Sequence, residues 1–254
     1  MTHSVSTFAW YDLATTDPDA AATFYDAVVN WTAEAVPNMP YTLFKTVGAI
    51  RTAGLMALPA HLREAGVPPH WTGYIGVDDV DAMVARVLEA GGSLKYGPSD
   101  VPGVGRFAVV ADPGGAVFQL FHWLEAEAGD AGMMALGRVG WHELRAADPD
   151  SAFGFYAGLF GWTRGRAIDM GPMGTYQLFD YGGTDRGGIM TTPPGVRPHW
   201  LFYFVVEAID AAIVRIETAG GTVLQGPNEV PGGAWVVTAR DPQGAPFALV
   251  APGR

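Results

Sequence analysis

The sequence has no cysteine, few basic residues and no long apolar segment, and each absence excludes a class of protein. Without cysteine there are no disulfides, no thiolate metal ligands and no cysteine nucleophile. Only 15 of the 254 residues are Lys or Arg, against 26 Asp and Glu, so the formal net charge is −11. Because phosphate binding needs clustered positive side chains, and no basic stripe is present, we expect no nucleic-acid partner.

Signals for membranes and secretion are also missing. No apolar run reaches the roughly 20 residues that a membrane span needs. The N-terminal stretch MTHSVSTFAWYDL lacks the charged-then-apolar pattern of a signal peptide. We therefore expect a cytoplasmic protein with no membrane partner. The composition that remains, 49% hydrophobic and 16% charged, is typical of a compact globular chain.

The sequence contains an internal duplication. Three pairs of segments match at a nearly constant spacing: 8–31 with 139–162, 69–92 with 198–221, and 97–120 with 226–249. The spacing is 131 residues for the first pair and 129 for the other two, so the copies differ by a short deletion in a loop. We predict a first half at 1–123, a linker at 124–137 and a second half at 138–254.

Each half is predicted to hold two βαβββ modules, which gives four modules in an α+β fold class. An alternating strand at 8–14 runs into Asp17-Pro18, a helix-start signal. A helix predicted at 80–90 ends at a Gly-Gly pair, as left-handed helix caps do. The Asp-Pro-x-Gly stretch at 112–115 lies between two apolar runs and predicts a hairpin. The second half repeats all three signals.

On these residues the chain resembles the vicinal oxygen chelate superfamily, which includes glyoxalase I, bleomycin-resistance proteins, fosfomycin-resistance enzymes and extradiol dioxygenases. The order of elements, the Phe-Tyr of the first helix, the Val-Asp-Asp-Val-Asp-Ala segment and the Asp-Pro-x-Gly hairpin carry the resemblance. The Trp-x-(Asp/Glu)-Leu and Pro-His-Trp segments are similar to the mycobacterial Cfp30B-like group, often labelled hydroxylases or glyoxalase-like proteins. The resemblance covers nearly the whole chain and implies tandem modules of the glyoxalase/bleomycin-resistance fold. It is specific for fold and says little about activity.

The resemblance also implies where a metal would be held. Metal-using members take ligands, usually His, Glu or Gln, from three strand positions per half. The matching residues are Trp10, Thr72 and Gln119 in the first half and Trp141, Leu201 and Ala248 in the second. Only Gln119 could bind a metal, so we expect no metal cofactor. The alternative is a divalent metal at a displaced site that uses His70, His199 and an acid.

The stretch WHEL in the second half places a His directly beside a Glu on a predicted strand. Successive strand side chains point to opposite faces, so His142 and Glu143 cannot share one site. The first copy reads WYDL and places Asp12 where the second has Glu143. We interpret Glu143 and Asp12 as candidate general bases. The alternative is a structural acid that pairs with Arg145 or Arg106, or reaches solvent.

Tryptophan and methionine are expected to line a curved sheet around these acids. The ligand-binding candidates are Trp10, Trp141, Thr72, Gln119, His70, His199, Met56 and Met190, and further aromatic candidates are Phe44, Phe179, Trp71 and Trp200. A mostly apolar surface with a few polar groups suits a planar or aromatic metabolite or antibiotic. The alternative is that the tryptophans fill the core between the repeats.

Two functions follow from this sequence. The first is a small-molecule-binding protein without the usual metal, acting as a monomer or homodimer. The alternative is an enzyme, a glyoxalase-like lyase, a dioxygenase or a hydroxylase-type tailoring enzyme. It would use Glu143 or Asp12 as general base, or the displaced metal site.

Overall fold

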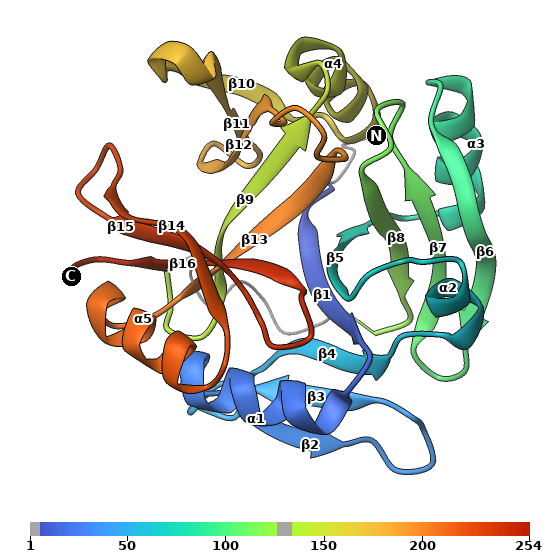
Figure 1. The fold of residues 1–254 in the computed structure, drawn as a ribbon. Helices are drawn as coiled ribbons and strands as arrows, with labels where there is room; N and C mark the ends of the chain where they lie inside the picture. The colour runs from blue at the N-terminus through green and yellow to red at the C-terminus, as the bar shows by residue number, and fades with distance from the viewer. Residues whose placement is uncertain (1–5, 126–133) are drawn as a thin grey trace. The chain divides into compact units, whose positions relative to one another are not determined.

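The computed structural model describes residues 6–125 and 134–254, and the order βαβββ occurs four times in them (Figure 1). Module 1 comprises β1 (Phe8–Thr15), α1 (Pro18–Val29), β2 (Thr32–Ala35), β3 (Thr42–Lys45) and β4 (Arg51–Ala57), and the short helix α2 (Ala60–Glu64) follows it. Module 2 comprises β5 (His70–Gly76), α3 (Val80–Glu89), β6 (Ser93–Val101), β7 (Gly105–Ala111) and β8 (Val117–Trp123).

The second half repeats both modules. Module 3 comprises β9 (Val139–Ala146), α4 (Pro149–Phe160), β10 (Thr163–Asp169), a 3-10 turn (Gly171–Met173), β11 (Thr175–Asp180) and β12 (Asp185–Thr191). Module 4 comprises β13 (His199–Val205), α5 (Ile209–Thr218), β14 (Thr222–Glu229), β15 (Trp235–Arg240) and β16 (Pro246–Ala251). The α+β class and the tandem βαβββ modules are thereby confirmed. No helix of the described residues has the length and apolar character that crossing a membrane requires.

Local sequence explains where the first helix of each half begins and ends. The Asp17 carboxylate accepts a hydrogen bond from the Ala20 N–H, and Asp148 does the same for Asp150 and Ser151. A proline in the first turn of each helix needs no N–H partner there. Both helices end at a left-handed residue, Asn30 in α1 and Gly161 in α4.

The strand that follows each helix was not located from the sequence. These four strands are β2, β6, β10 and β14, and each is the outermost of its run. Most of their side chains are exposed or half-buried, so they lack the alternation of apolar and polar residues that marks a half-buried strand.

Two compact units combine modules from different halves of the chain. Unit 1 takes the described parts of 1–9, 73–129 and 142–200, and therefore mainly modules 2 and 3. Unit 2 takes the described parts of 10–72, 130–141 and 201–254, and therefore mainly modules 1 and 4. The predicted linker at 124–137 falls largely on residues 126–133, outside the described residues, and the domain boundaries stay a prediction.

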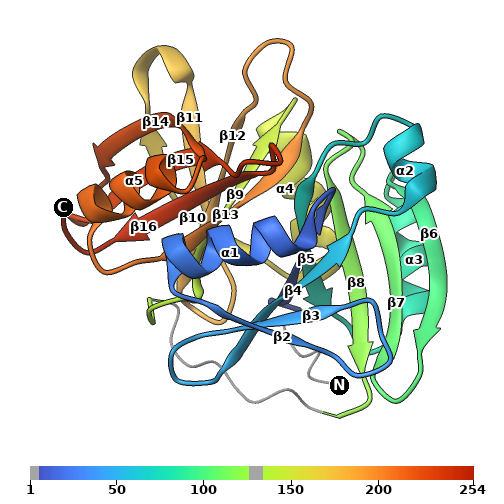
Figure 2. The same ribbon diagram turned by 60° about the horizontal axis from the view of Figure 1, so that its bottom comes forward.

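Within each unit the strands form two runs. Unit 2 has the orders β2-β3-β4-β1 and β13-β16-β15-β14, and its helices α1 and α5 lie side by side (Figures 1 and 2). Unit 1 has the orders β5-β8-β7-β6 and β10-β11-β12-β9, with α3 against α4. The first strand of modules 1 and 3 pairs with the last strand in parallel, β1 with β4 and β9 with β12.

A buried Trp–Tyr–Asp contact joins the two modules of each unit. In unit 2 the Tyr25 hydroxyl on α1 donates to Asp241 of module 4 at 3.2 Å and accepts from Trp71 Nε1 at 2.8 Å. The same contact in unit 1 joins Tyr156, Asp112 and Trp200, at 3.2 and 3.0 Å. Burial raises the pKa of the Asp112 and Asp241 carboxyls above the ordinary value for aspartate. It also raises the pKa of the Tyr25 and Tyr156 hydroxyls above the ordinary value for tyrosine. These helix tyrosines are therefore protonated and structural.

Four aromatic residues that were expected to line a ligand surface belong to this core instead: Trp71, Trp200, Phe44 and Phe179. Phe44 packs on Trp31 with ring centroids 5.0 Å apart, and Phe179 stacks on Trp162 at 4.7 Å. For these four, the alternative interpretation of core packing is correct, because their strand positions face the helices.

Candidate functional site

Unit 1 contains a buried acid that is bonded through both carboxylate oxygens. Glu143 on β9 is 4% exposed. Arg145 Nε pairs with its Oε1 at 2.5 Å, and the Tyr176 hydroxyl on β11 donates to its Oε2 at 3.0 Å. Strand alternation brings Glu143 and Arg145 to one face, so the ion pair follows from their spacing of two residues.

A glycine makes room for the tyrosine. Gly188 on β12 is the register partner of Glu143, and a Cβ atom there would lie 2.0 Å from the Tyr176 ring. Any larger residue would therefore displace the ring from the carboxylate. Met190, two residues further on β12, is the register partner of Arg145.

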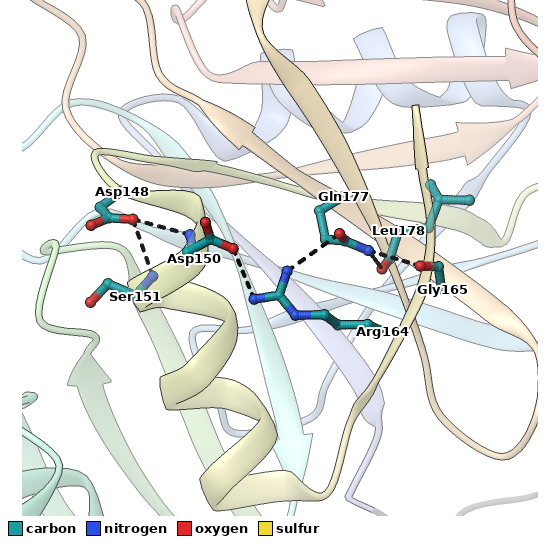
Figure 3. Close-up of polar contacts among 7 residues, drawn as sticks. All are labelled: Asp148, Asp150, Ser151, Arg164, Gly165, Gln177 and Leu178. Carbon is teal, nitrogen blue, oxygen red and sulfur yellow. Dashed lines mark hydrogen bonds and ion pairs between the residues drawn. The ribbon is translucent and has the colours of Figure 1, made fainter. Parts of the chain in front are cut away.

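Polar contacts on the other side of β11 connect this strand to helix α4 (Figure 3). Arg164 on β10 bonds Asp150 at 2.8 Å and the Gln177 side-chain oxygen at 3.3 Å. The Gln177 amide donates to the carbonyls of Gly165 and Leu178, both at 2.9 Å. Gln177 is next to Tyr176 in the chain, so these contacts help to fix the strand that carries the tyrosine.

His199 at the start of β13 lies near the Glu143–Arg145 pair. Its Nδ1 is 2.8 Å from the Arg197 carbonyl oxygen, which can only accept, so Nδ1 carries the proton and Nε2 is the acceptor nitrogen. Burial lowers the pKa of this imidazole, Arg145 lowers it further, and Glu143 opposes both. Glu143, His199 and Met190, three residues singled out from the sequence, all lie in unit 1.

Unit 2 contains a second version of the cluster. Asp12 on β1 is 5% exposed, and its Oδ1 accepts from the Tyr41 hydroxyl at 2.6 Å and from Trp10 Nε1 at 2.9 Å. Trp10 Nε1 also lies 2.9 Å from the Tyr41 hydroxyl. Gly54, the register partner of Asp12, again makes room, since a Cβ atom there would lie 1.8 Å from the Tyr41 oxygen.

The neighbours of the two acids differ. Where module 3 has Arg145, module 1 has Ala14, which cannot form an ion pair, and Met56 is its register partner. His70, the counterpart of His199, bonds the Pro68 carbonyl through Nδ1 at 2.8 Å. Thr72 is buried further along β5. The two clusters therefore share a geometry and differ in charge.

His142 is separated from Glu143, as strand alternation predicts. Its ring stacks on Phe8 with centroids 4.6 Å apart, and its Nδ1 donates to the Arg186 carbonyl at 2.9 Å. Burial lowers the pKa of His142 to about 4. The imidazole is therefore neutral near pH 7 and part of the core.

The three second-half positions where metal-using relatives place ligands are apolar and packed together. Leu201 and Ala248 belong to one buried cluster in unit 2 with Tyr203, and Trp141 packs against that cluster. These side chains offer no donor for Zn, Fe or Mn, so they do not fit a metal. In the described ranges no three His, Asp or Glu side chains group as a metal site. Gln119 is buried on β8 in unit 1, where its register partner on the neighbouring strand β5 is Tyr74.

Sequence reasoning missed Tyr41 and Tyr176. Both begin a Tyr-x-Leu-Phe stretch, 41–44 in the first half and 176–179 in the second. The repeated stretch was therefore a signal for these tyrosines, but the spacing between its two copies differs from that of the neighbouring repeated segments. In addition, each tyrosine lies about thirty residues from the acid that it contacts.

Comparison with known proteins identifies the family. The model of the Glyoxalase/Bleomycin resistance protein/Dioxygenase superfamily matches residues 7–120 and again 137–249. The "Putative glyoxylase CFP32" of Mycobacterium tuberculosis is 33% identical over 248 residues, covering 96% of this chain and 94% of the relative. The anthracycline biosynthesis protein DauV of Streptomyces sp. (strain C5) is 35% identical over 258 residues, covering 95% and 92%.

Solved structures show the same fold at low identity. A Mn(II)-bound glyoxalase from Novosphingobium aromaticivorans matches with a TM-score of 0.68 at 17% identity, covering 99% of this chain and 83% of that one. A variant of homoprotocatechuate 2,3-dioxygenase from B. fuscum matches with a TM-score of 0.69 at 16% identity, covering 98% and 72%. The duplicated βαβββ modules and the two family matches agree, and the chain belongs to the glyoxalase/bleomycin resistance/dioxygenase superfamily.

Proposed function

We propose that this protein binds a planar aromatic metabolite or antibiotic without the metal that its family commonly uses. The observation that carries the proposal is the apolar cluster at the family's ligand positions. Trp141, Leu201 and Ala248 replace metal donors with carbon surface, and Tyr203 adds a second aromatic ring. Carbon groups of this kind can pack against an aromatic ring, and they offer an ion no donor.

The relatives support this class of ligand. Two proteins from Streptomyces, 34 and 35% identical to this chain, are named for anthracycline biosynthesis. Anthracyclines are planar polycyclic aromatics that carry hydroxyl and carbonyl groups. A mostly apolar site with a few polar groups fits that chemistry.

Titration with an anthraquinone tests the proposal, with tryptophan fluorescence or calorimetry as the readout and elemental analysis of the same sample. We expect saturable binding that persists after chelation, and at least about tenfold weaker binding by Trp141→Ala. Trp235→Ala is the matched control, because Trp235 lies in the same unit and contacts Arg254 by a cation–π interaction. Stoichiometric metal that binding requires would overturn the proposal. Equal affinity of Trp141→Ala and the unmodified protein would also do so.

A second candidate function is catalysis by a buried carboxylate. A glyoxalase-like lyase, a dioxygenase or a hydroxylase-type tailoring enzyme is the reaction class, with Glu143 or Asp12 as general base. The observation that favours it is the tyrosine hydroxyl bonded to a buried acid in each unit. A catalytic base predicts that Glu143→Gln or Asp12→Asn abolishes turnover while ligand affinity stays nearly intact. Equal loss of both would count against catalysis.

A further inference from the structure

One face of the β5-β8-β7-β6 run in unit 1 is lined by aromatic rings. Phe118 on β8 packs against helix α4, where its ring contacts Phe155, so it points to the face that this helix covers. Residues that alternate with Phe118 along β8 therefore point to the opposite face. These are Gln119, Phe121 and Trp123, and the register partners of Gln119 and Phe121 on β7 are Val109 and Phe107.

The rings on this face contact one another in a continuous row, which we call the aromatic face of module 2. The Phe121 ring centroid lies 4.3 Å from that of Trp123 and 5.8 Å from that of Tyr74. Phe107 follows at 6.5 Å from Phe121, and Tyr96 on β6 lies 5.7 Å beyond Phe107. Tyr96 is 56% exposed and Phe121 only 6%, so the row runs from the surface of the unit to a buried end.

The fold does not require these aromatic residues. Module 4 forms the same strands with Val236 and Val250 as register partners at the places of Phe107 and Phe121. The close approach of the Phe121 ring also depends on Gly105, since a Cβ atom there would lie 2.4 Å from this ring, and module 4 has alanine at that place. The rings therefore differ from the other copy for a reason other than the strand framework.

Gln119 places a polar group at the buried end of this face. It is 9% exposed, and in the described residues, 6–125 and 134–254, its side-chain amide has no hydrogen-bond partner. A buried amide without a partner costs about 1–3 kcal/mol, so a group from outside the protein is needed to satisfy it. Its counterpart in module 4 is Ala248, which has no such need.

We propose that the aromatic face of module 2 binds a neutral, planar aromatic compound that carries a hydroxyl or carbonyl group. The ligand ring packs against Phe107 and Phe121, and its oxygen bonds the Gln119 amide, which can both donate and accept. The register partners of β7 and β8 on this face are uncharged, which favours a neutral ligand. This site goes beyond the proposed function, because it uses none of the residues of the apolar cluster in unit 2.

Titration with 2-naphthol and with naphthalene tests the proposal, because the two probes differ only in the hydroxyl group. The NMR signal of the Trp123 indole N–H reports binding at this face alone. We expect Gln119→Leu to weaken 2-naphthol binding about tenfold, equivalent to about 1.4 kcal/mol, and to leave naphthalene affinity unchanged. Phe107→Val, which copies module 4, should weaken both probes about tenfold.

Two further variants keep the test independent of folding defects. Tyr96→Ala changes an exposed side chain and should weaken both probes severalfold. His122→Ala is the matched control, since His122 lies on the same strand, alternates with Phe121 and Trp123, and bonds the Val77 carbonyl through Nδ1. It should leave both affinities unchanged.

Each outcome supports or overturns this site. Absence of a saturable shift of the Trp123 signal in the unmodified protein overturns it, and the apolar cluster in unit 2 is then still judged by Trp141→Ala. Equal weakening of the two probes by Gln119→Leu overturns the hydrogen bond to the amide. Unchanged affinities in both Phe107→Val and Tyr96→Ala, or an equal loss in His122→Ala, overturn the aromatic face as the binding site.

Discussion

The acid clusters of the two units have the same geometry and different electrostatics. Each has an acid on the first strand of a module, a tyrosine that bonds it, and a glycine that makes room. Glu143 is held by a cation, whereas Asp12 shares its oxygen between Tyr41 and Trp10. After duplication, the framework of this contact stayed and its charge balance changed.

Unlike the acid clusters, the Trp–Tyr–Asp contacts are the same in both units. Both copies keep the same three residue types and nearly the same distances. These contacts join modules from different halves, and each unit contains one of them. The comparison therefore separates a contact that is the same in both units from one whose charge balance differs.

The largest expected difference between the units concerns their buried acids. Glu143→Gln leaves the half-buried Arg145 without this carboxylate, and losing one partner of a largely buried pair costs up to about 3 kcal/mol of the free energy of unfolding. Asp12→Asn keeps an oxygen that accepts from Trp10 and Tyr41, so we expect a cost of about 1 kcal/mol. Chemical denaturation of both variants at pH 7 measures the difference.

The double variant Glu143→Gln with Arg145→Ala is the control for that difference. Removing the cation that has lost this carboxylate should restore part of the lost stability, because module 1 folds with Ala14 at this position. Equal costs for Glu143→Gln and Asp12→Asn would show that the ion pair does not distinguish the two units.

The next effect concerns His142, which has Tyr11 as its counterpart in module 1. Burial lowers the pKa of His142 to about 4, whereas an unfolded histidine titrates near 6.5. The unfolded chain therefore binds more protons between these values. The contribution of His142 is complete above pH 6.5 and is lost as the pH falls to about 4, by up to about 3 kcal/mol.

His142→Tyr copies the first half and removes this dependence. We expect the free energy of unfolding of the variant to fall less between pH 7 and pH 4 than that of the unmodified protein. Parallel pH profiles for the two proteins would contradict the assignment of a buried neutral imidazole.

Periodicity explains what the sequence could predict. The repeat predicted the four modules, and the two-residue period of strands separated His142 from Glu143 and placed Trp10 beside Asp12. The family resemblance predicted the fold. These features depend on local spacing, which a sequence states directly.

Features that depend on contacts between distant residues could not be predicted from the sequence. The contact of Tyr25 with Asp241 joins modules from different halves, and nothing near either residue in the sequence indicates that partner. The four outermost strands lack apolar alternation because water covers them. Trp71 and Trp200 were wrongly expected to contact the ligand. Their burial against the helix tyrosines Tyr25 and Tyr156 depends on tertiary packing, which the local sequence does not state.

The two Trp–Tyr–Asp contacts predict a smaller and symmetric effect. Tyr25→Phe and Tyr156→Phe each remove a hydroxyl that accepts from a tryptophan and donates to an aspartate, leaving buried polar atoms without that partner. We expect each variant to lose about 1–3 kcal/mol of the free energy of unfolding, with similar values for both. Clearly unequal losses would show that this contact also diverged.

The smallest expected effect concerns the helices of modules 2 and 4, α3 and α5. The Asp79 side chain caps α3 by accepting from the Ala82 N–H at 3.0 Å, whereas the cap position before α5 is Ala208, which has no side chain able to do so. Asp79→Ala should lower the unfolding free energy by about 1 kcal/mol, and Ala208→Asp should raise it by up to about the same amount. Thermal and denaturant midpoints measure both changes, and Ala208→Gly is the control for the backbone at that position.

Because each cap acts on one helix end only, neither change should alter ligand affinity. A loss of stability in Ala208→Asp would mean that α5 begins differently from its counterpart.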